Sequence, residues 1–441
     1  MKEMRLKLLT LIFSLFCSNA WAQMGKLFNA DNQLSSNFAN YVYQDRDGFI
    51  WVSTRNGLNR YDGYQFRIFR KEDEDCGLNS NYINSITQSH DGTIFVGSHN
   101  SIQAYDGSRF NDVELKDVDG KTIHAFINYL VETKAGVLLA CTSGYGILRL
   151  NAKERTGKAD PALSGNQNYV RYLLEDRTGR YWILTEDHGL FLVKGKQRTS
   201  YFTDEESRSS LSMVMQDSKN NIYVPVRDMG VFRYDEQQRQ FVLIPKTAGL
   251  SITAFYIDTD DQLLIGCDGQ GLFKYNPKDD TLINNPYYTR DMDIKKGKVS
   301  SILEDRNGNI WVCLLHKGLF MQPKARLAFG YMGERLGDKN VIGSNCVTST
   351  LIDKRGRFWI GTDKDGLYMM DKNSLGVRHF TNCPSTILCM AEDVRGRIWI
   401  GSYTEGCGWI DPVSGAWHRE LASLGKNISV FGLAPASNGD T

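Results

Sequence analysis

Short apolar and aromatic runs recur along the chain at a nearly constant spacing, and polar turns separate them. Residues 353–362, with the sequence D-K-R-G-R-F-W-I-G-T, are a clean copy of the pattern, and G-L follows at residues 366–367. Successive copies lie 40 to 48 residues apart. A repeat of this length with several short strands corresponds to one four-stranded blade of a β-propeller. The pattern therefore predicts an all-β propeller. The turn glycine, or the residue that replaces it, lies at Gly48, Gly92, Gly136, Gly179, Asn220, Asp261, Gly308, Gly356 and Gly396.

Each copy is expected to fold as four short strands. In the first copy, residues 42–45 lead into the tight turn D-R-D-G at residues 45–48, and residues 49–54 are rich in aromatic and β-branched side chains. Such side chains favour strands. Residues 58–62 and 64–69 supply the third strand and the outer fourth strand. In the turn, Asp accepts backbone hydrogen bonds and Gly permits a positive φ. This D-x-x-G turn joins the first strand to the second in each copy.

Two positions of the repeat hold similar residues from copy to copy. One position in the second strand is Trp in five copies and another large apolar or aromatic residue in the others. Recurrence in every copy indicates packing between neighbouring sheets rather than ligand binding. The same argument makes the aspartates of the D-x-x-G turns structural. The predicted structural repeat core includes Trp51, Trp182, Trp311, Trp359 and Trp399.

The spacing of the copies divides the chain into two regions. Seven copies fall within residues 23–325, which predicts a seven-bladed β-propeller. Residues 323–345 interrupt the rhythm. Residues 326–441 hold two complete copies and the start of a third, so we expect a partial second propeller there. One ring of nine or ten blades is the alternative. Because the last copy stops inside its turn motif, we expect the chain to be a fragment of a longer protein.

The first 22 residues have the features of a secretory signal peptide. Three basic residues precede a mostly apolar run at residues 8–17, which is too short to span a bilayer. An A-x-A motif at residues 20–22 predicts cleavage after Ala22. We therefore expect an exported, periplasmic chain with no membrane segment in its mature part.

Charge and cysteine content exclude several kinds of site. The chain has 52 Lys and Arg residues against 51 Asp and Glu residues, so it lacks the basic surplus of a nucleic-acid binder. No two of the eight cysteines after residue 22 have the C-x-x-C spacing of a zinc site, and we predict no metal and no cofactor. Cys141, Cys267 and Cys313 are expected to pack inside strands as small apolar residues. Cys383 and Cys389 are the one pair to test for a disulfide.

The loops that join second and third strands vary from copy to copy. In a propeller these loops share one face, opposite the D-x-x-G turns, and variable loops on a rigid frame often carry function. Their polar and aromatic side chains can hydrogen-bond to a sugar and stack on it, so we expect an oligosaccharide ligand there. The ligand-binding candidates are Arg55, His99, Tyr145, Glu186, His188, Arg227, Asp228, Gln270 and His316.

Familiar catalytic motifs do not occur in the sequence. It contains no G-x-S-x-G, H-E-x-x-H or G-x-x-x-x-G-K-[ST] motif, and we predict no catalytic residue. A glycosidase would need two carboxylates roughly 5–10 Å apart. Glu186, Asp187, Asp228 and Asp268 leave this alternative open. A lyase or glycosidase built on a propeller, and a protein-interaction scaffold, are therefore the alternatives to a ligand-binding propeller.

The repeat resembles that of the two-component regulator propeller family. Residues 78–83 (L-N-S-N-Y-I) and 342–347 (I-G-S-N-C-V) are similar to the family's L-S-S-N-x-V lead-in. Residues 305–312 (D-R-N-G-N-I-W-V) are similar to its D-x-x-G-x-I-W-I core. The resemblance covers residues 34–439. This family forms periplasmic sensor regions of hybrid two-component systems in Bacteroidetes.

The resemblance implies a sensor for oligosaccharides released from complex glycans. In such systems two seven-bladed propellers precede a β-sandwich, a transmembrane helix, a histidine kinase and often a receiver with a DNA-binding domain. None of the seven histidines of this chain lies in a helical phospho-acceptor context. We therefore expect a sensor region that is truncated before any kinase and is not itself an enzyme. A homodimer is compatible with this expectation.

Overall fold

The computed structural model describes residues 25–195, 197–284, 287, 294–324, 342–344, 346–371, 377–420 and 427–434. These residues form nine β-sheets, two short α-helices, α2 (Pro161–Ser164) and α3 (Glu205–Ser210), and two 3-10 turns, Pro245–Thr247 and Ile294–Lys296. The predicted all-β propeller class is thereby confirmed. The signal peptide predicted at residues 1–22, with its cleavage after Ala22, lies outside the described residues. Among the helices of the described part, none is long and apolar enough to cross a membrane.

Seven sheets lie in one compact unit that comprises Met24–Tyr288 and Asp293–Arg326. Sheet 1 contains β2 (Ala39–Gln44), β3 (Ile50–Thr54), β4 (Gly57–Tyr61) and β5 (Phe66–Phe69). Sheet 2 contains β6 (Ile83–Gln88), β7 (Ile94–Ser98), β8 (Ile102–Tyr105) and β9 (Phe110–Asp112). Sheet 3 contains β11 (Phe126–Glu132), β12 (Leu138–Ser143), β13 (Ile147–Asn151), β14 (Thr156–Ala159) and β10 (Glu114–Lys116). Sheet 4 contains β15 (Val170–Glu175), β16 (Tyr181–Thr185), β17 (Leu190–Lys194) and β18 (Gln197–Tyr201).

The remaining sheets of this unit follow the same order. Sheet 5 contains β19 (Met215–Gln216), β20 (Ile222–Val226), β21 (Gly230–Asp235) and β22 (Gln240–Leu243). Sheet 6 contains β23 (Ile252–Ile257), β24 (Leu263–Cys267), β25 (Leu272–Asn276) and β26 (Thr281–Asn284). Sheet 7 contains β27 (Val299–Glu304), β28 (Ile310–Leu314), β29 (Gly318–Gln322) and β1 (Lys26–Phe28).

A second compact unit includes Leu327–Thr441 and contains two sheets among its described residues. Sheet 8 contains β30 (Val347–Ile352), β31 (Phe358–Thr362), β32 (Leu367–Met370) and β33 (Val377–Phe380). Sheet 9 contains β34 (Ile387–Glu392), β35 (Ile398–Ser402), β36 (Cys407–Ile410) and β37 (Trp417–Glu420). Trp359, Phe380 and Ile387 belong to the apolar cluster between these two sheets.

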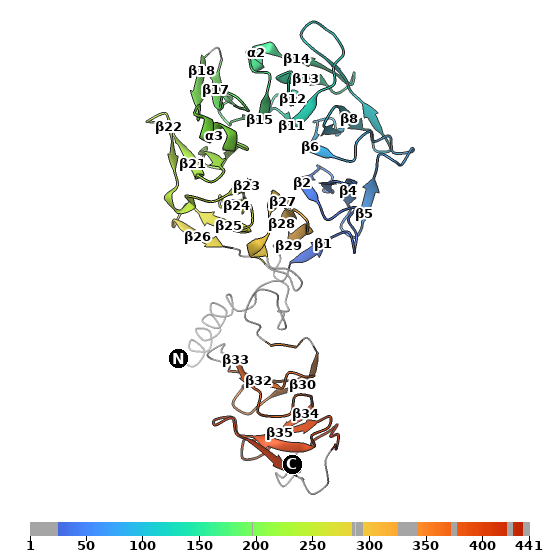
Figure 1. The fold of residues 1–441 in the computed structure, drawn as a ribbon, viewed down its shortest axis with the longest axis vertical. Coiled ribbons are helices and arrows are strands. Elements are labelled where there is room, and N and C mark those ends of the chain that lie inside the picture. Colours follow the sequence, from blue (N-terminus) through green and yellow to red (C-terminus); the bar gives the residue numbers. More distant parts are fainter. Residues whose placement is uncertain are drawn as a thin grey trace, which may run out of the picture. The chain divides into compact units, whose positions relative to one another are not determined.

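The seven sheets of the first unit form a ring (Figure 1), and in the six sheets whose first strand is labelled there, this strand lies nearest the centre. Strands β2, β6, β11, β15, β23 and β27 surround the axis, whereas β18, β22 and β26 lie at the rim. Neighbouring strands that follow one another along the chain pair antiparallel within each sheet. Successive loops therefore alternate between the two faces of the ring. The D-x-x-G turns share one face, and the loops between second and third strands share the other.

The N-terminal strand β1 closes the ring. It pairs antiparallel with β29, and Phe28 lies opposite Leu319. Sheet 7 therefore contains both the first strand of the ring, β1, and its last three strands, β27 to β29. Contacts continue across the junction with sheet 1, where Ser300 Oγ donates a hydrogen bond to the Ala39 carbonyl at 2.7 Å. Phe28 is fully buried, and its ring stacks 6.0 Å from the indole of Trp311.

Sheet 3 departs from the predicted four-stranded blade. Strand β10 follows the last strand of sheet 2 and adds in parallel to the outer strand β14, with Glu114 opposite Thr156. Val113, Leu115 and Ile123, on and around β10, are buried in the apolar cluster that sheets 2 and 3 share. The burial of these side chains holds the segment against sheet 3, which therefore has five strands.

The recurring Asp and Trp residues form one hydrogen-bonded unit. In sheet 1, Asp45 Oδ1 accepts the Phe49 backbone N–H at 2.9 Å, and Asp45 Oδ2 accepts the Trp51 indole N–H at 2.7 Å. The indole bond recurs in sheets 4, 7, 8 and 9 at 2.8 to 3.1 Å. A buried carboxylate is costly without such partners, so the turn and the tryptophan stabilise each other. Trp51, Trp182, Trp311 and Trp359 are buried, and Trp399 is partly exposed.

The glycine position of the turn requires a left-handed backbone. Gly308 has a φ of 77°. Asn220 and Asp261 replace the glycine in sheets 5 and 6 and adopt φ values of 70° and 61°. Asn and Asp are the non-glycine residues that enter this region most readily. The two exceptions to the glycine pattern therefore keep the same turn.

Hydrogen bonds join neighbouring sheets all around the D-x-x-G face. Gln88 Oε1, at the end of β6, accepts the Arg46 backbone N–H from the turn of sheet 1 at 2.7 Å. Gln44 Oε1 accepts the Arg306 N–H at 2.8 Å and so joins sheet 7 to sheet 1. The D-x-x-G face is thus occupied by junctions between sheets. The other five junctions use His90 with Glu132, Lys134 with Glu175, Arg177 with Gln216, Ser218 with Asp261, and Thr259 with Glu304.

All eight cysteines of the described part are free thiols, so the Cys383–Cys389 disulfide considered above is not formed. Cys141, Cys267 and Cys313 are buried, as expected for packing residues. Burial raises the pKa of the Cys267 thiol to about 12. These thiols are therefore neutral apolar groups of the core.

Candidate ligand-binding face

The nine predicted ligand-binding residues all lie on loops between second and third strands. Because every sheet of the ring has the same strand order, these loops share one face, which we call the loop face. Arg55 lies between β3 and β4, His99 between β7 and β8, Tyr145 between β12 and β13, Glu186 and His188 between β16 and β17, Arg227 and Asp228 between β20 and β21, Gln270 between β24 and β25, and His316 between β28 and β29.

In five of the seven sheets, a backbone hydrogen bond fixes this loop to a residue at or before the start of the first strand of the same sheet. The Arg55 N–H donates to the Phe38 carbonyl at 3.2 Å, and the Glu186 N–H donates to the Tyr169 carbonyl at 3.0 Å. The Arg227, Asp268 and Leu315 N–H groups make the same bond at 2.8 to 3.0 Å. We call the accepting residue, and the residue at the same register in sheets 2 and 3, the entry position. The entry positions of sheets 1 to 7 are Phe38, Tyr82, Phe126, Tyr169, Ser210, Ser251 and Lys298.

Arg55 and His316 meet on a shared aromatic ring, although they come from different sheets. The Arg55 guanidinium lies 4.4 Å from the centre of the Phe38 ring. The His316 imidazole lies 4.2 Å from the same ring, in an edge-on arrangement. Phe38 therefore brings together two predicted residues from sheets 7 and 1.

His99 connects sheets 2 and 3 in a similar way. Its imidazole lies 4.7 Å from the Tyr82 ring and stacks 4.8 Å from the Phe126 ring at an interplanar angle of 20°. Tyr145, on the next loop, is 37% exposed and Phe126 is 39% exposed. This part of the loop face therefore presents several aromatic edges and faces to solvent.

The other predicted residues are spread over sheets 4 to 6. Glu186 is ion-paired with Arg171 at 3.3 Å. His188 contacts the carboxylate of its neighbour Asp187 at 2.9 Å. These groups hold one another in place on the loop between β16 and β17.

Sheets 5 and 6 present three more of the predicted residues. The side chains of Arg227 and Asp228 are exposed, and Asp228 has a φ of 63°. Gln270 accepts the Ser251 N–H through its side-chain oxygen at 3.3 Å. The structure thus places the predicted residues on one face, but it spreads them around the ring rather than into one cluster.

Two of the four carboxylates considered for a glycosidase, Glu186 and Asp268, are engaged in ion pairs with basic side chains. Besides the Glu186–Arg171 pair, Lys298 Nζ lies 2.5 Å from Asp268 Oδ2. Within the described residues, no group of three or more His, Cys, Asp or Glu side chains is arranged to hold a metal ion.

The entry-position aromatics were not among the residues predicted from the sequence. Phe38, Tyr82, Phe126 and Tyr169 lie 44, 44 and 43 residues apart, which is the period of the repeat itself. This spacing was the one feature of the sequence that could have revealed the four aromatic residues as a set. It was missed because each of these residues lies at or just before the start of a first strand, where an aromatic residue is also typical of the strand itself.

A cavity of about 180 Å³ lies along the axis, among the first strands of the ring. The Tyr129 and Tyr172 rings stack there at 4.2 Å. Burial raises the pKa of Tyr172 to about 12 and that of Tyr129 well above its usual value. These side chains narrow the axis below the loop face, and none of the nine predicted residues lines the cavity.

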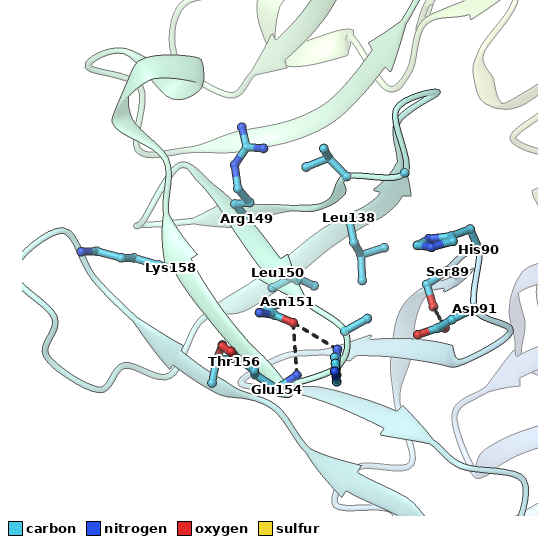
Figure 2. A pocket seen from close by; sticks show the side chains of 14 residues that line it. Ser89, His90, Asp91, Leu138, Arg149, Leu150, Asn151, Glu154, Thr156 and Lys158 are labelled. Atoms are coloured by element: carbon cyan, nitrogen blue, oxygen red, sulfur yellow. Dashed lines mark hydrogen bonds between the residues drawn. The ribbon is translucent and has the colours of Figure 1, made fainter.

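A larger hollow of about 680 Å³ lies on the D-x-x-G side of sheets 2 and 3. Figure 2 shows His90 on one side and Arg149 with Lys158 on the other. His90 contacts Glu132 at 3.3 Å, and Arg149 contacts Asp160 at 2.8 Å. His90 and Arg149 thus already have partners in the protein, and none of the nine predicted residues lines the hollow, so we place the candidate site on the loop face.

Six segments of the chain match the sequence model of the two component regulator propeller family. They are residues 33–56, 77–100, 164–187, 293–314, 342–364 and 383–404. Each segment runs from the entry of a sheet through its first strand and D-x-x-G turn to the end of its second strand. The chain is therefore built of two component regulator propeller repeats, which confirms the resemblance inferred from the sequence.

Relatives with known descriptions agree with this class. Histidine kinase P4 of Formosa agariphila is 42% identical over 50 residues, which are 11% of this chain and 4% of that protein. The extracellular domain of a system described as a hybrid two component system, from B. thetaiotaomicron, is 18% identical with a TM-score of 0.63, over 95% of this chain and 55% of that one. A second such domain from the same organism is 17% identical with a TM-score of 0.51, over 90% and 53%.

The chain spans about half the length of these extracellular domains. A streptogramin B lyase is also similar, with 13% identity and a TM-score of 0.53 over 69% of this chain and 99% of the lyase. At these identities the solved structures establish the propeller fold. They do not identify a ligand for this chain, so the residues of the loop face are the basis for the proposal below.

Proposed function

We propose that this chain is the periplasmic ligand-binding region of a two-component regulator and that it binds a glycan-derived oligosaccharide at the loop face. In this proposal residues 23–325 form the ligand-binding propeller, and residues 326–441 begin a second propeller. Residues 1–22 direct export. The histidine kinase of the same system relays the signal.

The observation that carries the proposal is the composition of the loop face on a regulator-propeller frame. Tyr169 is 45% exposed there, beside Phe126 and Tyr145, and the loops add Arg, His, Glu and Gln side chains. Small-ligand sites combine aromatic surface with a few convergent polar groups. A sugar ring offers an apolar C–H face for the former and hydroxyl groups for the latter.

The binding proposal is tested with the full chain and a panel of oligosaccharides of defined length. Isothermal titration calorimetry measures binding, and chromatography of the same mixtures measures turnover. We expect at least one oligosaccharide to bind and to be recovered unchanged. A chain that binds no member of the panel would contradict the proposal. Product formation would favour the alternative of a propeller enzyme that acts on carbohydrate.

Two loop variants test the location of the site. We expect Arg227→Ala and His188→Ala to weaken binding while the melting temperature stays within a few degrees, because both side chains are exposed and hold no part of the core. Lys219→Ala, at an exposed position of the D-x-x-G turn of sheet 5, is the control. An equal loss of affinity in the control would refute the assignment to the loop face.

A further inference from the structure

The entry positions divide the ring into two unlike halves. In sheets 1 to 4 the entry position is aromatic, and in sheets 5 to 7 it is serine or lysine. Every one of these residues occupies the same place beside the loop of its own sheet. Because all seven entry positions share this place in the repeat, the choice between an aromatic and a polar side chain changes the chemistry of the loop face. We call the first set, Phe38, Tyr82, Phe126 and Tyr169, the aromatic arc.

Two histidine side chains pack against rings of the aromatic arc from the neighbouring sheet. His316 of sheet 7 packs on Phe38, and His99 of sheet 2 stacks on Phe126. In both cases a loop residue of one sheet covers the entry residue of the next. This packing orients the rings of Phe38 and Phe126 and fixes them before any ligand arrives, which lowers the entropy cost of binding.

Phe38 and Tyr82 are half-buried, but the other two rings of the arc are more exposed than packing of the ring requires. Phe126 is 39% exposed and Tyr169 is 45% exposed, whereas Trp51 and Trp182 of the repeat core are at most 1% exposed. The contacts between sheets are already supplied by the buried tryptophans and by the hydrogen bonds of the D-x-x-G face. Contiguous exposed apolar surface on a soluble protein marks an interaction site.

An amide without a partner lies two residues after the first ring of the arc. In sheets 2 and 3, Asn84 and Asn128 donate through Nδ2 to carbonyls of the next sheet, each at 2.8 Å. Their counterpart in sheet 1 is Asn40, whose Nδ2 is buried and has no hydrogen-bond partner among the described residues. The carbonyl of Ile83 is taken instead by Ser53 Oγ at 2.5 Å. Asn40 thus differs from its two counterparts in keeping a buried amide donor without a partner in the described part of the chain.

We propose that the aromatic arc is a stacking platform for a linear oligosaccharide whose successive sugar rings lie across sheets 1 to 4. The inference rests on the proposed function and adds to it the shape of the ligand and the half of the ring that holds it. One sugar ring covers one aromatic ring, so a surface that repeats over four sheets selects an extended chain over a monosaccharide. The polar side chains of the loops supply hydrogen bonds along its edge.

The test uses the full chain and ladders of cello-, laminari-, xylo- and galacturonate oligosaccharides of one to six sugar residues. Titration calorimetry on the wild type first identifies a binding ladder. In that ladder we expect affinity to rise with each added residue up to about four. Phe126→Ala and Tyr169→Ala should each weaken binding of the longest member about tenfold, which is the size of one lost ring contact.

The same position in the other half of the ring supplies the matched control. Ser251→Ala changes an entry position outside the arc and should alter the affinity less than twofold. Thermal melts of all three variants report folding. If no ladder binds the wild type, the proposed function itself fails. If a ladder binds but the two aromatic variants keep wild-type affinity, or Ser251→Ala weakens binding as much as they do, the arc proposal alone is overturned.

Discussion

Asp176 shows at the scale of a single residue how the repeat stabilises itself. Burial of its carboxyl group would raise its pKa, but hydrogen bonds from Thr178, Arg180 and Trp182 outweigh burial and lower the pKa below its usual value. The Trp182 indole N–H donates to Asp176 Oδ2 at 3.0 Å, and Arg180 Nε lies 2.6 Å from the same oxygen. The ionised carboxylate is therefore a structural group of the blade.

The pH dependence of stability tests this role. Because the folded-state pKa of Asp176 is lowered, its contribution is present above the unfolded-state pKa of about 4 and is lost as pH falls through the lower folded-state value. Asp176→Asn should therefore lower the melting temperature at pH 7, and the gap from wild type should narrow below pH 4. A gap that stays constant from pH 7 to pH 2 would show that the charge of Asp176 is irrelevant to stability.

The sequence indicates such residues well because they recur. The Asp and Trp positions could be assigned to structure from nine copies, although the bond that couples them is visible only when the turn is folded. Residues that differ between copies are harder. Asn40 is the clearest case, because its unpaired amide depends on Ser53 reaching the carbonyl that its counterparts use. No pattern along the chain reports that competition.

At the scale of elements, the strands that complete the ring lie outside the repeat. Strand β1 has three residues and precedes the first copy of the motif, yet it supplies the outer strand of sheet 7. Strand β10 has three residues and joins a sheet that begins after it. Such short segments carry no periodicity of their own. Their places follow from open strand edges that only the closed ring defines, so the sequence predicted four-stranded blades and missed the fifth strand.

Closure by β1 leads to a stability prediction. Phe28 is fully buried against Trp311, Tyr61 and Phe66. We expect Phe28→Ala to destabilise the protein by about 3–5 kcal/mol, as for other large-to-small changes in a core. Urea denaturation monitored by tryptophan fluorescence measures the effect. Tyr64→Ala, at a site that is 89% exposed, is the control. Equal midpoints for wild type and Phe28→Ala would show that β1 does not close the ring.

At the scale of the whole ring, the D-x-x-G face and the loop face differ in the interactions that their residues make. The D-x-x-G face carries the hydrogen bonds that join sheet to sheet, and His90 and Arg149 at its 680 Å³ hollow contact acidic side chains of the protein. The loop face carries the exposed rings and the variable polar side chains. Sequence reasoning separated the faces correctly, since strand alternation alone decides which loops share one. It could not tell how the rings of different sheets would meet.

The most direct test of this division is hydrogen–deuterium exchange of the full chain with and without an oligosaccharide that binds it. The account predicts slower exchange at residues 36–40, 80–84, 99–101, 124–128, 144–146 and 167–171, and unchanged exchange at the D-x-x-G turns. Protection confined to the D-x-x-G turns or to the hollow around His90 and Arg149, with no change along the loop face, would contradict it.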